Sequence, residues 1–107
     1  MTKAINDVIA ERQRQIEKEG FDNKHDNQWR DEELAQAAAI YALSPQSREI
    51  KVEGGMISPL LLIERIWPWN FEWYKPTVND RRKELVRAAA LILAEIDRLD
   101  AIKKGEE

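Results

Sequence analysis

The stretch from Asp80 to Asp100, DRRKELVRAAALILAEIDRLD, decides the fold of this chain. It begins with charged residues, continues through an almost uninterrupted apolar middle and ends in alternating charge. A helix that is apolar nearly all round must be covered by other helices. The stretch therefore predicts a long, central C-terminal helix, running to about Lys104, in an all-α helical bundle.

Preceding segments predict the other helices, so that the bundle has about four. Residues 3–19 place apolar side chains and one arginine on a single helical face: Ile5, Val8, Ile9, Arg12 and Ile16. Thr2 is the expected N-cap of this helix and Gly20 its C-terminal residue. A second helix is expected to begin at Asp31 and to end before Ser44-Pro45, because the residue before a proline avoids helical geometry.

Between the second and the last helix the chain predicts several smaller elements. REIKVEGGMI fits a small hairpin around Gly54-Gly55. Ser58-Pro59 resembles the N-cap and first residue of a short third helix, SPLLLIERI, which Trp67-Pro68 ends. Thr77 to Asp80 resembles a capping box at the start of the last helix, and Gly105 marks its exit.

Composition limits the class of protein. With 107 residues the chain is expected to form one domain, residues 1–107, and a chain this short favours a homo-oligomer. The net charge of −3 argues against general nucleic-acid binding. There is no cysteine, which excludes disulfides and thiolate zinc sites and fits a cytoplasmic location. No apolar run approaches the roughly 20 residues of a membrane span.

Carboxylates near the starts of two helices are candidate magnesium ligands. Glu33 and Glu84 are the strongest candidates, because Mg²⁺ binds hard oxygen ligands and bundles often present pairs of acids spaced three or four residues apart. The positions three residues later hold Gln36 and Arg87. Glutamine is a weak neutral ligand and arginine repels a cation, so Glu84 and Arg87 fit an i, i+3 ion pair equally well.

The segment WPWNFEWYKP is unusually aromatic. One interpretation is a loop that folds back and covers the core, because tryptophan buries a large area. The other is a stacking platform for a base, formed by Trp67, Trp69 and Trp73. Cations that would then hold a phosphate are Lys75, Arg81, Arg82 and Arg87. Arg81 and Arg82 also lie at the positive end of the last helix, which attracts anions.

The single histidine, His25, is followed by Asp26 in a polar loop. A histidine with an acidic neighbour but no nucleophile is weak evidence for catalysis, so a hydrogen-bonding role in the loop is the simpler interpretation. It is kept as a ligand-binding candidate.

Three stretches together resemble the MazG-like group of all-α nucleotide pyrophosphohydrolases, in particular short proteins of bacteriophages and prophages. They are VIAERQRQIEKEG, HDNQWRDEELAQAAAIYA and RRKELVRAAALILAEIDRLD, which cover about half of the chain in the order of the family. The resemblance implies an oligomeric helical bundle with a magnesium site made by Glu-x-x-Glu and Glu-x-x-Asp. Carried over, these motifs fall on Glu33 with Gln36 and on Glu84 with Arg87, so two acids are missing.

The leading hypothesis is therefore a small phage-type protein that binds a nucleotide or a nucleotide-derived (for example cyclic) signalling molecule. It would sequester that molecule against a host defence without efficient hydrolysis and without a required cofactor, in the host cytoplasm if phage-encoded. The first alternative is a Mg-dependent nucleoside triphosphate pyrophosphohydrolase, with Glu32 or Asp80 supplying the missing carboxylates. The second is a protein-binding module whose Trp-rich loop docks on a host protein.

Overall fold

The computed structural model describes residues 2–20, 32–54 and 57–106. Its elements, in chain order, are α1 Lys3–Glu19, α3 Glu33–Ala42, α4 Pro45–Arg48, β1 Lys51–Gly54, β2 Ile57–Leu61, α5 Leu62–Ile66, the 3₁₀ turn η1 Phe71–Trp73 and α6 Arg81–Glu106. The predicted His25 and the predicted helix start at Asp31 lie outside the described residues.

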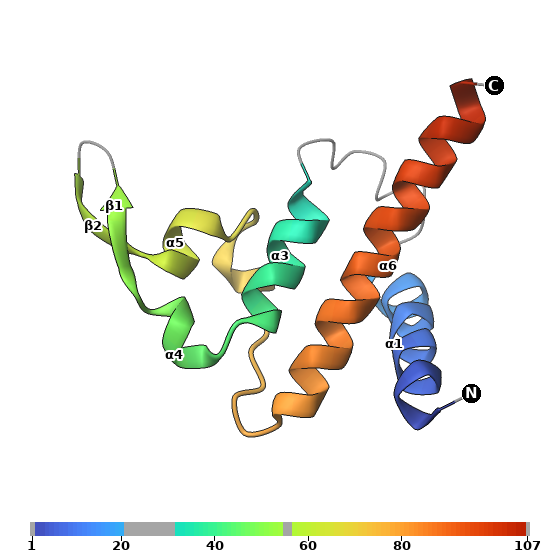
Figure 1. The fold of residues 1–107 in the computed structure, drawn as a ribbon, viewed down its shortest axis with the longest axis horizontal. Coiled ribbons are helices and arrows are strands. Elements are labelled where there is room, and N and C mark those ends of the chain that lie inside the picture. The colour runs from blue at the N-terminus through green and yellow to red at the C-terminus, as the bar shows by residue number, and fades with distance from the viewer. Residues whose placement is uncertain (1, 21–31, 55–56, 107) are drawn as a thin grey trace.

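Helix α6 runs through the middle of the molecule, with α3 on one side and α1 on the other (Figure 1). Its α3-facing side contributes Ala88, Leu91 and Ala94 to the core. The core side chains of α3 are Leu34, Ala37, Ala38, Ile40 and Tyr41, and Ile63 and Trp67 close the core from the following segment. The alanines on both helices allow their backbones to approach closely. The predicted all-α bundle around a long C-terminal helix is confirmed.

Helix α1 covers α6 with unexpected residues. Its buried side chains are Arg12 and Gln15, whereas Ile5 and Ile9 from the predicted apolar face are about half exposed. Arg12 Nε lies 3.6 Å from Asp97 Oδ2 on α6. The α1–α6 contact is therefore partly polar, and α1 keeps apolar surface outside the core.

The ends of the long helices follow the expected capping chemistry, with two corrections. Thr2 caps α1 by accepting a hydrogen bond from the Ile5 amide at 3.2 Å, and Gly20 takes the left-handed conformation that glycine favours, with φ 73°. At α6 the N-cap is Asp80 and not Thr77, since Asp80 Oδ1 accepts from the Lys83 amide at 3.1 Å. The helix also continues through Gly105 to Glu106.

The hairpin is confirmed, but the predicted helix from Ser58 is wrong. Strands β1 and β2 pair antiparallel, with Val52 opposite Leu60. Residues 57–61 therefore have their backbone groups committed to β1, and α5 begins only at Leu62. Pairing with the preceding strand overrides the Ser-Pro signal for a helix start.

Ser44-Pro45 both ends one helix and begins another. It ends α3, as predicted, and the Ser44 side chain then accepts a hydrogen bond from the Ser47 amide at the start of α4. Trp67 follows the end of α5, as expected. Within the described ranges, none of the helices is both long and apolar enough to cross a membrane.

Candidate functional site

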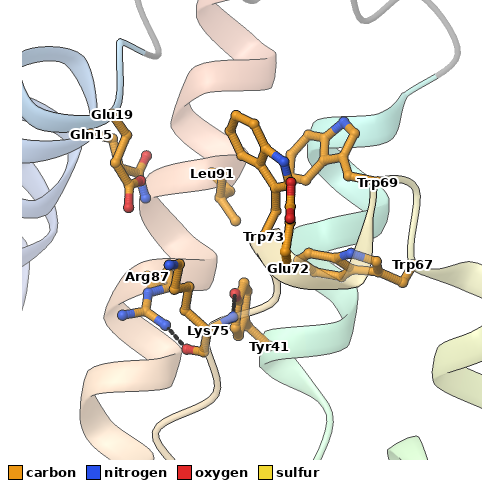
Figure 2. Close-up of a pocket in the computed structure, with 10 residues that line it drawn as sticks. All are labelled: Gln15, Glu19, Tyr41, Trp67, Trp69, Glu72, Trp73, Lys75, Arg87 and Leu91. Atoms are coloured by element: carbon orange, nitrogen blue, oxygen red, sulfur yellow. Dashed lines mark hydrogen bonds between the residues drawn. The ribbon is translucent and has the colours of Figure 1, made fainter.

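A cavity of about 580 Å³ opens between α1, α3, α6 and the aromatic segment 67–75. Figure 2 shows Gln15 and Glu19 on the α1 side, facing the tryptophans across Arg87 and Leu91 of α6. The complete lining is Gln15, Glu19, Tyr41, Trp67, Trp69, Glu72, Trp73, Lys75, Arg87 and Leu91. Five of the predicted ligand-binding residues, Trp67, Trp69, Trp73, Lys75 and Arg87, are thus brought together.

The aromatic wall of the cavity is a connected set of rings. Trp67 lies at its centre, with edge-to-face contacts to Tyr41 at 5.7 Å and to Trp69 at 5.6 Å between ring centroids. Trp67 is buried, and its indole Nε1 donates to the Asn70 carbonyl at 3.2 Å. Trp67 therefore belongs both to the hydrophobic core and to the wall of the cavity, whereas Trp73 lies at the rim of the cavity with 49% of its surface exposed. The interpretation of the segment as a cover for the core therefore holds for Trp67, and its interpretation as a stacking platform stays a prediction for the more exposed rings.

Arg87 is the cation best placed in the cavity. Its guanidinium carbon lies 5.2 Å from the centroid of the Tyr41 ring, and its Nη1 donates to the Lys75 carbonyl. Tyr41 Oη in turn accepts from the Lys75 amide at 2.8 Å. Burial raises the pKa of Tyr41, so the phenol stays neutral at pH 7. Arg87, Tyr41 and Lys75 thus fix one another's positions through these contacts. The Arg87 guanidinium keeps further N–H groups that can donate to a ligand.

Gln15 brings a buried polar atom to the cavity. The side chain is 1% exposed, and its Oε1 has no hydrogen-bond partner among the described residues. Its Nε2 donates to Glu11 Oε2 at 3.4 Å, and Arg14 donates two hydrogen bonds of 2.7 and 2.8 Å to the same carboxylate. Burial raises the pKa of Glu11, but the Arg14 bonds outweigh it and lower the pKa overall. An ionised Glu11 takes the amide N–H and leaves the carbonyl for the cavity.

Glu84, the acid predicted from the last helix as a magnesium ligand, is bound by protein donors instead. It is fully buried, and Arg48 donates to both of its oxygens at 2.8 and 2.9 Å. The Thr77 amide adds a bond of 3.1 Å. Burial raises the pKa of Glu84, yet these donors hold it below its ordinary value. Glu84 therefore joins α6 to α4 and to the loop before α6.

Arg81 and Arg82, the predicted phosphate ligands at the start of α6, also have protein partners. Arg81 Nη1 donates to the carbonyls of Tyr41 at 2.8 Å and Leu43 at 3.0 Å, at the negative end of α3. Arg82 Nη1 bonds Asp7 Oδ2 at 2.8 Å. Neither lines the aromatic cavity.

Glu33 and Glu84 are not brought together. Glu33 lies at the start of α3 and acts electrostatically on Arg98, whereas Glu84 lies 14 residues, or about 21 Å of helix, before Arg98. In the described part of the chain, no group of three or more acidic or histidine side chains is arranged to hold a metal ion.

Sequence reasoning missed Arg48, Gln15 and Tyr41. Arg48 is 2% exposed, yet it lies in a short segment with no helical periodicity to predict burial. Gln15 follows the charged run of α1, where a polar residue predicts exposure. Tyr41 lies among the buried residues of α3, but nothing local to it in the sequence signals the contact with Arg87, 46 residues later.

Comparison with family models, curated proteins and solved structures finds no match to this chain. The resemblance to the MazG-like group therefore stays a prediction, and the function has to be argued from the cavity itself.

Proposed function

We propose that this protein binds a nucleotide, or a signalling molecule derived from one, in the aromatic cavity and sequesters it without efficient hydrolysis. The observation that carries the proposal is the combination of a wall of aromatic rings in mutual contact and the Arg87 guanidinium in one cavity of about 580 Å³. That volume lies within the range of roughly 300–1,000 Å³ typical of small-molecule sites.

The walls suit a flat, apolar ring. Trp69 and Trp73 present indole surfaces at the mouth, and Leu91 supplies an aliphatic floor on α6 (Figure 2). Stacking of a base on an aromatic side chain contributes about 1–3 kcal/mol and tolerates different bases. The Gln15 Oε1, which has no partner among the described residues, can accept a hydrogen bond from a ligand N–H. A base with an amino or ring N–H at its edge can use both features.

An anionic group of the ligand would lie toward Arg87 and Lys75. Arg87 is fixed by the Tyr41 ring and the Lys75 carbonyl, so little side-chain entropy is lost when it binds an anion. Lys75 is exposed at the rim, where its ammonium can reach a second anionic oxygen. Glu19 and Glu72 also line the cavity and limit its positive charge, which favours a ligand with few phosphates over a triphosphate.

Binding without turnover is supported by where the acids lie. Metal-assisted hydrolysis needs carboxylates that gather an ion next to the phosphate. Glu84 is saturated by Arg48 and the Thr77 amide, and Glu33 lies toward the opposite end of the α3–α6 contact. The two carboxylates of the cavity, Glu19 and Glu72, come from separate segments.

Calorimetric titration with a panel of nucleoside mono-, di- and triphosphates and cyclic dinucleotides, with and without Mg²⁺, tests the proposal. We expect saturable binding of at least one monophosphate or cyclic compound in the absence of Mg²⁺. Pyrophosphate and phosphate release are measured on the same samples, and Mg²⁺-dependent turnover by the wild-type chain would establish the hydrolase alternative in its place.

Matched variants separate the cavity from the rest of the surface. Trp73→Ala should weaken binding about 5- to 150-fold, the equivalent of 1–3 kcal/mol. Phe71→Ala removes an equally exposed ring in the same 3₁₀ turn that does not line the cavity, and it should leave binding unchanged. Arg87→Met should weaken the binding of anionic ligands. Arg82→Met, from the same helix but outside the cavity, is the control and should leave that binding unchanged. Equal effects of Trp73→Ala and Phe71→Ala, or no affinity for any compound of the panel, would contradict the proposal and leave the protein-binding alternative.

A further inference from the structure

Helix α6 carries an apolar stripe that no described element covers. The stripe consists of Leu85, Ile92, Ile96 and Leu99, which are 45–51% exposed. The other faces of α6 are occupied, because α3 and α1 pack against them (Figure 1). A contiguous row of large aliphatic side chains along four turns of an exposed helix face marks an interaction surface.

The spacing of the stripe is that of a helix–helix seam. Leu85, Ile92 and Leu99 are spaced seven residues apart. Ile96 lies four residues after Ile92, and the half-buried Ala89 lies four residues after Leu85. Positions that alternate three and four apart keep one edge of a helix facing a partner helix along its length. The stripe is about 21 Å long at 1.5 Å per residue.

We propose that the stripe binds the same stripe of a second copy of this chain, with the two α6 helices antiparallel. Leu85 and Leu99 lie equally far on either side of Ile92. A two-fold axis near Ile92 therefore places the Leu85 of each copy near the Leu99 of the other. Such a surface is complementary to itself, as a two-fold interface requires. This inference does not depend on the proposed function.

The charges flanking the stripe favour the antiparallel arrangement. The start of α6 is basic, with Arg81, Arg82 and Lys83, and Asp97 and Asp100 lie near the far end of the stripe. In the antiparallel pair Arg82, whose Nη1 also bonds Asp7 of its own chain, approaches Asp100 of the other copy. Both residues lie on the same flank of the stripe, because successive residues of an α-helix are 100° apart. A parallel pair would set the basic starts of both helices against each other. Antiparallel helix dipoles also attract.

The absence of cysteine in the sequence makes a direct test of orientation available. Ile92→Cys, Leu85→Cys and Leu99→Cys are each prepared as the full chain and treated with a short bismaleimide. We expect Ile92→Cys to cross-link to itself. Leu85→Cys and Leu99→Cys should remain monomeric on gels when treated alone and should cross-link when mixed. A parallel pair would instead cross-link each variant to itself, and that result would overturn the proposal.

Mass measurement by light scattering across a concentration series tests the association without modification. The wild-type chain should reach twice its 12.5 kDa mass, at micromolar concentrations or above because the seam is narrow. Ile92→Asp should lose the dimer, and Val78→Asp, which changes an exposed apolar residue outside the stripe, should keep it. Circular dichroism checks that both variants remain folded. A wild-type chain that stays monomeric throughout, or a dimer that survives Ile92→Asp, would refute the interface.

Discussion

Replacing Glu84 by leucine should destabilise this protein more than any substitution at its surface. The carboxylate is fully buried and receives two hydrogen bonds from Arg48 and one from the Thr77 amide. Leucine keeps much of the volume but removes the negative charge. Arg48, itself 2% exposed, would then carry an uncompensated positive charge in the interior.

The expected loss is about 3–5 kcal/mol, the usual cost of removing one partner from a buried ion pair. A chain of 107 residues has an unfolding free energy of about 5–16 kcal/mol. The variant would therefore retain about 0–13 kcal/mol of unfolding free energy. With a urea dependence of about 1.5 kcal/mol per M, the loss corresponds to a fall of about 2–3 M in the unfolding midpoint.

Urea unfolding at pH 7, followed by circular dichroism at 222 nm, measures this difference. Asp7→Asn is the matched control, since Asp7 also bonds an arginine of α6 but does so at the surface, where ion pairs contribute about 0–1 kcal/mol. The Glu84→Leu/Arg48→Met double variant should be more stable than Glu84→Leu, because it removes the orphaned charge. The carbonyls of Tyr41 and Leu43 keep a donor in Arg81.

The reasoning fails if Glu84→Leu costs less than about 1 kcal/mol, since the pair would then behave as an exposed one. It also fails if the double variant is less stable than Glu84→Leu alone, because the destabilisation would then not arise from the unpaired guanidinium.

Three further outcomes follow from the same contacts. Folding lowers the pKa of Glu84 below its ordinary value of 4.5, so as the pH falls the carboxylate takes up a proton more readily in the unfolded chain than in the folded one. The urea midpoint should therefore be constant above about pH 5 and should fall as the pH drops below 4.5. In the Glu84→Leu/Arg48→Met variant this fall should be smaller. Trp67→Ala should cost about 3–5 kcal/mol in thermal or urea unfolding, whereas Trp73→Ala, at the exposed rim, should cost less than about 1.5. Asp80→Ala should cost about 0.5–2 kcal/mol through loss of the α6 N-cap, and Asp80→Asn should restore most of it.

The long helices could be predicted from the sequence because their signals are local. Residues 3–19 match α1 at both ends, and the apolar run after Asp80 matches the central α6. The start of α5 could not be predicted, because residues 57–61 are held as a strand by their pairing with β1. A local Ser-Pro signal carries no information about a partner strand.

In the candidate site, too, the features with local sequence signals could be predicted and those that depend on distant residues could not. The aromatic segment was open to two interpretations, a cover for the core and a stacking platform, and it lines the cavity together with Arg87. The positions of Arg81, Arg82 and Glu84 could not be predicted, because each depends on a distant partner: the end of α3, Asp7 and Arg48. A charged residue near a helix end looks the same in sequence whether it faces a ligand or closes the protein on itself.

The loop that carries the aromatic wall is positioned through its backbone. The Lys75 amide bonds Tyr41 Oη, the Lys75 carbonyl accepts from Arg87, and the Thr77 amide bonds Glu84. None of these bonds involves the ring of Trp73. The identity of the side chain at position 73 can therefore change while the main chain beneath it stays in place, so the surface at the rim of the cavity can evolve separately from the architecture that holds it.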